Sequence, residues 1–198
     1  KNEEGGEAGG SIVIYGGYYT HHLNEDIYVQ SGRLIAKNEF FQPSKLETLV
    51  TDKSVRKKLI LEGIKKNIEE ILEKNTMILV YPIPEAGSLV ASELYLKYKL
   101  RSYFSTKTFD EFIKKNKYYI STPYEDYLER NKEILSLLND IEHPNLYKVN
   151  PAKYFCNNQI QNRCITHTDK AVYYHDRHHL SPEGAKFVNE DIIEILKK

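Results

Sequence analysis

Apolar residues recur at intervals of three and four over residues 52–74 of the chain. This spacing places them on one face of a helix and leaves lysine and glutamate on the other face, so the segment is predicted to be an amphipathic helix. Residues 124–139 and 88–100 are also predicted to be helical, whereas the pattern over 102–122 is ambiguous. The apolar positions of the first helix are Val55, Leu59, Ile60, Ile64, Ile68, Ile71 and Leu72.

Short apolar runs predict four buried strands, because an unbroken run bounded by glycine or proline suits a strand that is covered on both faces. We expect residues 18–41 to be irregular. The expected strands cover residues 12–15, 76–82, 146–149 and 171–174.

A final helix is predicted to begin after Ser181, which is a suitable N-cap, with Pro182 at the first helical position and Glu183 in the first turn. It would run to the C-terminus. The order of strands and helices predicts an α/β domain with a mainly parallel sheet, in which functional sites lie where strands end and loops begin.

Composition limits the domain organisation and the partners. A chain of 198 residues fits one domain. Residues 1–10 combine glycine with charge and are predicted to be a flexible segment, so the folded domain would cover 11–198. The 28 basic and 28 acidic side chains cancel, and no basic stretch indicates a nucleic-acid partner. We find neither a transmembrane segment nor a signal-peptide pattern.

Cys156 and Cys164 are eight residues apart in a polar stretch, and no second cysteine pair completes a zinc site. We expect a local disulfide, which would indicate an oxidising compartment such as a periplasm. The alternative is a pair of unrelated reduced thiols.

Asp176 and His179 stand three residues apart just before the predicted terminal helix. In acyl transfer, a carboxylate orients a histidine whose other ring nitrogen takes the proton of a hydroxyl nucleophile. We therefore predict that both residues are catalytic. Metal binding would need other histidines, but adjacent histidines point in different directions and no metal-binding spacing is present, so we expect no metal and no cofactor. These other histidines are His21, His22, His175 and His178.

Residues 173–185, Tyr-Tyr-His-Asp-Arg-His-His-Leu-Ser-Pro-Glu-Gly-Ala, resemble the last sequence block of SGNH hydrolases. They look most like the SGNH domains fused to integral-membrane acyltransferases that O-acetylate bacterial surface polysaccharides. Residues 81–85, Tyr-Pro-Ile-Pro-Glu, match a proline-rich turn of those domains, and the two cysteines match a pair that precedes the Asp/His block. The resemblance covers residues 11–198 and implies a three-layer, flavodoxin-like SGNH-hydrolase fold.

The resemblance also implies a function. It indicates an O-acyltransferase, specifically an O-acetyltransferase, that modifies a bacterial surface glycan through a Ser-His-Asp acyl-enzyme mechanism. The partners would be a glycan acceptor, an acyl donor and a fused or associated membrane acyltransferase domain. The domain would lie on the periplasmic or extracellular side, as part of a membrane-anchored protein. The alternatives are a free carbohydrate esterase and a catalytically inactive module that binds a glycan or a partner.

The nucleophile of SGNH enzymes lies in a Gly-Asp-Ser block after the first strand, and this sequence contains no such block. We expect the serine, with the first strand, upstream of residue 1; the alternative is that the nucleophile has been lost. Ser11 precedes its strand, and Ser88 is better explained as a helix cap. The family uses glycine and asparagine as oxyanion donors, for which Gly16, Gly17 and Asn24 are the candidates.

Overall fold

The computed structural model describes residues 10–17, 19–23, 52–102, 111 and 120–197. Its central sheet contains three parallel strands in the order β1-β2-β4: β1 (Ile12–Tyr15), β2 (Thr76–Val80) and β4 (Leu146–Val149). All three were predicted from their apolar runs. Because the strands are parallel, their carboxyl ends meet at one edge of the sheet.

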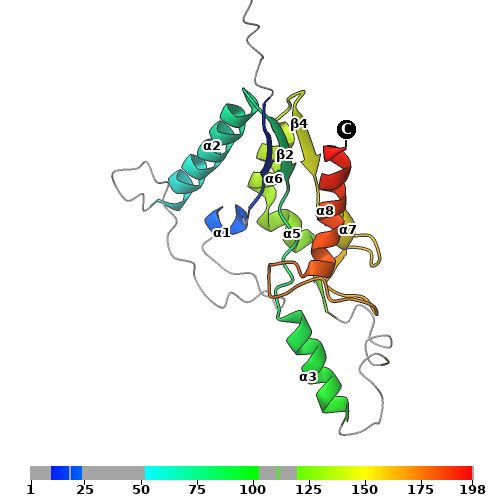
Figure 1. Ribbon diagram of the computed structural model, residues 1–198. Coiled ribbons are helices and arrows are strands. Elements are labelled where there is room, and N and C mark those ends of the chain that lie inside the picture. Colours follow the sequence, from blue (N-terminus) through cyan, green and yellow to red (C-terminus); the bar gives the residue numbers. More distant parts are fainter. Residues whose placement is uncertain (1–9, 18, 24–51, 103–110, 112–119, 198) are drawn as a thin grey trace, which may run out of the picture.

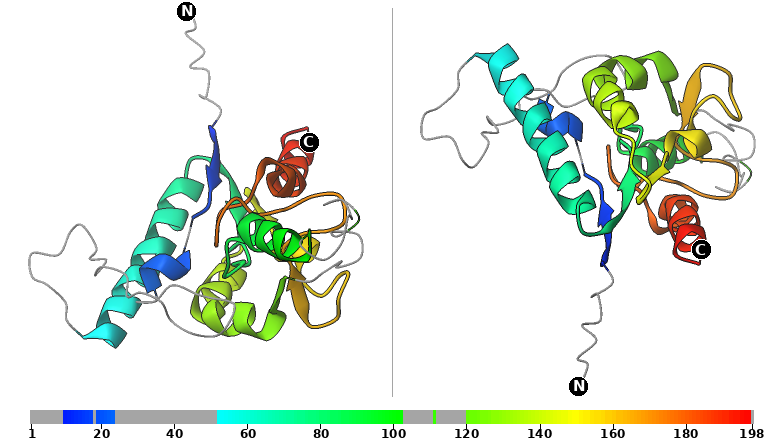
Figure 2. Two further views of the ribbon diagram at one scale, coloured as in Figure 1. Left: turned by 90° about the horizontal axis from the view of Figure 1, so that it is seen from below. Right: turned by 90° about the horizontal axis from the view of Figure 1, so that it is seen from above.

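Helices cover both faces of this sheet (Figures 1 and 2). On one face, Met77 and Leu79 of β2 pack with residues of α2 (Lys53–Leu72) and α6 (Lys132–Asp140). On the other face, Ile78 packs with Val188 of α8 (Pro182–Leu196). These side chains of β2 are completely buried, as expected for a continuous apolar strand between two layers. The domain is therefore a three-layer α/β structure, as predicted.

The long helix α2 forms as its apolar spacing predicts. Asp52 is its N-cap and accepts hydrogen bonds from the backbone N–H groups of Ser54 and Val55, at 2.9 and 3.0 Å. Ile60 and Ile68 are buried against the sheet layer. The cap thus fixes the start of the helix, and the apolar face stabilises the helix against the sheet.

A smaller antiparallel pair of strands, β3 (Ser121–Pro123) and β5 (Arg163–Ile165), lies beside the main sheet. Three more helices belong to this part of the chain: α3 (Val90–Ser102), α5 (Tyr124–Arg130) and α7 (Ala152–Phe155). Cys156 and Cys164 form the expected disulfide, which joins the end of α7 to β5. The disulfide is buried in an apolar cluster that includes Phe155 and Tyr174.

Two predictions are wrong within the described residues. The prediction that residues 18–41 are irregular fails over α1 (Tyr19–Leu23), which is helical and buries Tyr19 and Leu23 in the core beneath α2. Residues 24–41 lie outside the described residues. Residues 171–174 do not form a strand of the sheet. Val172 and Tyr174 make only isolated bridges, to residues 167 and 180. The backbone groups of this apolar segment therefore bond to neighbouring loops and not to a strand of the sheet.

The helix predicted over residues 124–139 is divided into α5 and α6 at Asn131. The side-chain amide of Asn131 donates to the carbonyl of Tyr127 at 2.9 Å, and its backbone has φ −104° and ψ 6°. The backbone N–H of Asn131 donates to the same carbonyl at 3.2 Å, so the side chain shares this acceptor, and the backbone leaves helical geometry at this residue.

Candidate active site

The loop between residues 175 and 180 is folded around the carboxylate of Asp176. The backbone N–H groups of His178 and His179 both donate to Asp176 Oδ1, at 2.9 and 2.8 Å. The N–H of His175 donates to the carbonyl of His179 at 2.9 Å and closes the turn. A short aspartate side chain stabilises turns of this kind, so the local sequence is enough to bring Asp176 and His179 together.

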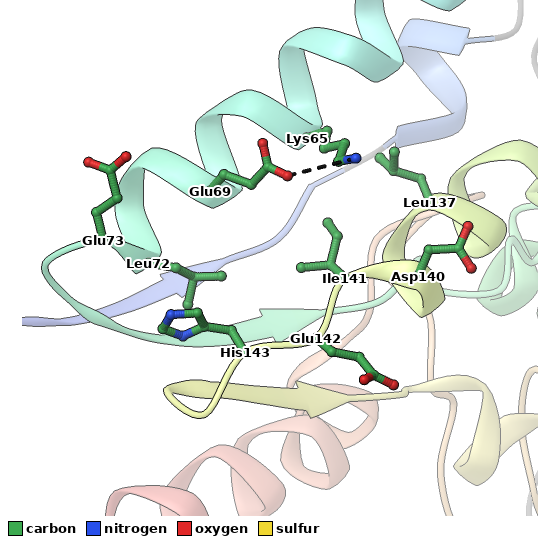
Figure 3. A pocket seen from close by; sticks show the side chains of 9 residues that line it. All are labelled: Lys65, Glu69, Leu72, Glu73, Leu137, Asp140, Ile141, Glu142 and His143. Carbon is green, nitrogen blue, oxygen red and sulfur yellow. Dashed lines mark ion pairs between the residues drawn. The ribbon is translucent and has the colours of Figure 1, made fainter.

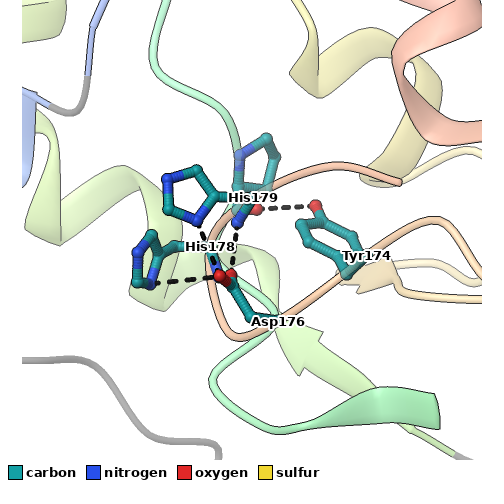
Figure 4. Close-up of polar contacts among 5 residues, drawn as sticks. Tyr174, Asp176, His178 and His179 are labelled. Atoms are coloured by element: carbon teal, nitrogen blue, oxygen red, sulfur yellow. Dashed lines mark hydrogen bonds and ion pairs between the residues drawn. The ribbon is translucent and has the colours of Figure 1, made fainter. Parts of the chain in front are cut away.

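The imidazole of His179 pairs with the same carboxylate, with Nδ1 2.7 Å from Asp176 Oδ2 (Figure 4). An ionised carboxylate can only accept, so Nδ1 carries the proton and Nε2 keeps a free lone pair. Partial burial opposes ionisation of Asp176, but hydrogen bonds from His178 and His179 outweigh it and hold the pKa of the carboxyl well below its usual value. The His179 side chain is 66% exposed, so a ligand can reach Nε2.

The proline-rich turn after β2, residues 81–85, and the two residues that follow it are hydrogen-bonded to this part of the chain. Tyr174, which is completely buried, donates from its hydroxyl to the carbonyl of Pro84 at 2.6 Å (Figure 4). The N–H groups of Ala86 and Gly87 donate to the carbonyl of Arg177 at 2.8 and 3.1 Å. Gly87 has φ 66°, a conformation that favours glycine. Sequence reasoning singled out the turn but missed Tyr174, because the two segments are 90 residues apart.

The start of α8 is also held against the loop. The Ser181 hydroxyl donates to the carbonyl of Val172 at 2.7 Å and accepts from the N–H of Gly184 at 3.2 Å, which confirms its role as N-cap. A Cβ atom at Gly184 would collide with the carbonyl oxygen of Tyr173. The Ser-Pro-x-Gly sequence therefore lets the terminal helix begin directly beside the Asp176–His179 pair.

A pocket of about 450 Å³ opens beside His178 and His179, at the carboxyl ends of β1 and β2. The carboxyl edge of a parallel sheet is where ligands bind in many α/β proteins. Gly16 and Gly17 line this pocket, so two of the three candidate oxyanion donors share a cavity with His179. The third, Asn24, lies outside the described residues, as do the side chains of His21 and His22.

The family model described as "SGNH domain (fused to AT3 domains)" matches residues 6–194. The chain belongs to this family. No curated protein and no solved structure matches it. Among the described residues, no helix is long and apolar enough to cross a membrane.

The described residues around this pocket do not include a serine. The family motif follows the first strand, and here Gly16, Gly17 and Tyr18 follow β1, the first strand described, and no serine lines the described pocket. Two of the lining hydroxyl groups are already engaged: Tyr19 donates to Val80 O at 3.1 Å, and Tyr81 donates to an asparagine side chain at 2.9 Å.

The two serines that sequence reasoning considered lie away from this pocket. Ser11 is exposed before β1, where its N–H donates to the side chain of Asn75 at 3.1 Å. Ser88 does not cap α3 as expected, because its buried hydroxyl has no hydrogen-bond partner within the described residues. Neither serine lines the His179 pocket.

A second pocket, of about 380 Å³, lies between α2 and the end of α6 (Figure 3). Its wall includes Leu72 and Glu73, which precede β2, and His143, which precedes β4. It is therefore at the amino ends of the strands, opposite the Asp176–His179 pair. Lys65 and Glu69 approach one another across its rim at 3.8 Å, an exposed ion pair of little energetic weight.

Proposed function

We propose that this SGNH domain transfers an acyl group, specifically acetyl, to a hydroxyl group of a bacterial surface glycan. The observation that carries the proposal is the Asp176–His179 pair: an ionised carboxylate 2.7 Å from Nδ1, with an accessible Nε2 beside a pocket at the carboxyl edge of the sheet. This arrangement is that of a general base oriented by a carboxylate.

In the proposed chemistry, His179 takes up and releases a proton twice. A serine hydroxyl attacks the carbonyl carbon of the acyl donor while Nε2 takes the hydroxyl proton, and the leaving group departs with that proton. The glycan hydroxyl then attacks the acyl-enzyme; Nε2 takes its proton and returns it to the serine oxygen. Asp176 keeps the imidazole in the required tautomer and stabilises the imidazolium. Gly16 and Gly17 are proposed to donate backbone N–H groups to the oxyanion.

The serine is proposed to come from a segment upstream of residue 1, and the acyl donor from a fused or associated membrane acyltransferase domain, in keeping with the family description. A location on the periplasmic or extracellular side is supported by the buried disulfide, because such bonds persist in oxidising compartments. Transfer of the acyl group to water, as in a carbohydrate esterase, would use the same residues.

A second candidate is an inactive module that binds a glycan or a partner domain. It is favoured by one observation: Tyr18 follows Gly16 and Gly17 at the end of β1, and no serine lines the described pocket. In this case the pocket would be retained for binding while the nucleophile had been lost.

Labelling of the full-length protein with a fluorophosphonate separates the two candidates, because only an activated hydroxyl reacts. An enzyme should be labelled on serine, and replacement of His179 with alanine or Asp176 with asparagine should slow labelling by about 10²–10⁴-fold. His175→Ala is the matched control, since His175 is an exposed histidine of the same loop. Absence of label on the wild-type protein, together with retained glycan binding, would favour the binding module.

A further inference from the structure

Two histidines, not one, approach the carboxylate of Asp176. Nδ1 of His178 lies 3.9 Å from Asp176 Oδ1, and Nδ1 of His179 lies 2.7 Å from Oδ2. One ligand atom from each of the three residues falls within 4.8 Å of the others. In Figure 4, dashed lines join the carboxylate of Asp176 to both histidines. Adjacent histidines diverge in an extended chain, but the tight turn around Asp176 directs both Nδ1 atoms to the same side.

We propose that Asp176, His178 and His179 form a site for a divalent transition metal of the zinc type, and that metal occupancy and the general-base role of His179 exclude one another. Imidazole nitrogen and carboxylate oxygen are ligands that zinc prefers, at about 2.0–2.2 Å, so two ligands of one tetrahedral ion are about 3.4 Å apart. The gap of 3.9 Å at His178 is close to this separation.

The backbone that carries the three ligands is already ordered. Both histidine N–H groups are bonded to Asp176 Oδ1, and the carbonyl of Arg177 is held by Ala86 and Gly87. Only the side chains need to adjust, chiefly the ring of His179, which is 66% exposed. The pocket side stays open for water as a fourth ligand, as in zinc sites with three protein ligands.

Metal binding would compete with the proposed chemistry at a defined atom. An ion bound to Nδ1 of His179 displaces the proton that this nitrogen shares with Asp176, and an ion bound to Nε2 occupies the lone pair that accepts the serine proton. In either case His179 no longer serves as a base. The inhibitory effect rests on the proposed function, whereas metal binding itself does not.

Zinc affinity of the full-length protein can be measured by competition with a chromophoric chelator. We expect His178→Ala to weaken zinc binding by about tenfold or more, and His175→Ala, the exposed neighbour, to leave it unchanged. Equal zinc affinity in wild type, His178→Ala and Asp176→Asn would overturn the site, because the zinc would then be bound elsewhere.

Fluorophosphonate labelling in the presence of zinc tests the second half of the proposal. Zinc should suppress labelling of the wild type but not of His178→Ala, which keeps the Asp176–His179 pair. Equal suppression in both proteins would overturn the mutual exclusion. If His178-dependent zinc binding is found in a protein that never labels, the metal site stands and the proposed acyl transfer fails.

Discussion

The hydroxyl of Tyr174 connects the proline-rich turn to the loop of residues 175–180, and its removal should destabilise the domain. Tyr174→Phe keeps the ring and its packing but deletes the hydrogen bond to Pro84 O. Both residues are buried, so water cannot replace the lost donor. The net loss of such a bond is about 1 kcal/mol, and an unsatisfied buried carbonyl costs about 1–3 kcal/mol. We expect the free energy of unfolding to fall by about 1–3 kcal/mol.

Thermal and urea unfolding followed by circular dichroism measure this effect. For a domain of this size, the expected loss corresponds to a decrease in Tm of about 2–12 °C. Tyr95→Phe is the matched control, because Tyr95 is 54% exposed on α3 and its change should alter stability by no more than about 0.5 kcal/mol. Equal stability of Tyr174→Phe and Tyr95→Phe would refute the argument that this bond supports the loop.

Three further predictions test the fold. In chemical denaturation, Gly63→Ala should stabilise the protein by about 0.5–1 kcal/mol, because an exposed helical position has space for a methyl group. Gly184→Ala should instead destabilise it by about 1–3 kcal/mol, because the methyl group would collide with a backbone carbonyl. Replacement of Cys156 and Cys164 with serine should cost about 2–3 kcal/mol, measured in the same way. Burial lowers the pKa of His167, so the unfolded chain binds a proton more readily than the folded chain. The free energy of unfolding should therefore fall as the pH drops below about 6.5. The His167→Gln variant should lose less of this free energy between pH 7.5 and 5.

Much of the architecture was predictable because its causes are local. The spacing of apolar residues predicted α2, continuous apolar runs predicted β1, β2 and β4, and a capping serine followed by proline predicted the start of α8. The pairing of Asp176 with His179 also follows from a short turn, since the two residues are three positions apart. Each of these features depends on residues within a few positions of one another, so the sequence displays them directly.

The errors show where local pattern fails. Residues 171–174 have the composition of a strand, but neighbouring loops satisfy their hydrogen bonds. The apolar pattern over 124–139 continues through Asn131, although the backbone leaves helical geometry at this residue and α5 ends there. In both cases the apolar residues correctly predicted a buried segment. The pattern did not show which groups would form hydrogen bonds with its backbone N–H and C=O groups.

The sequence by itself determined the α/β class, the main strands and helices, and the pairing of Asp176 with His179. Only the tertiary structure decided that Gly16 and Gly17 share a pocket with His179, that Tyr174 supports the loop through Pro84, and that Gly184, unlike Gly63, has no space for a methyl group. The physical reason is distance along the chain. Contacts between residues far apart in sequence leave no periodic signal, and they arise only when the packed layers bring the segments together.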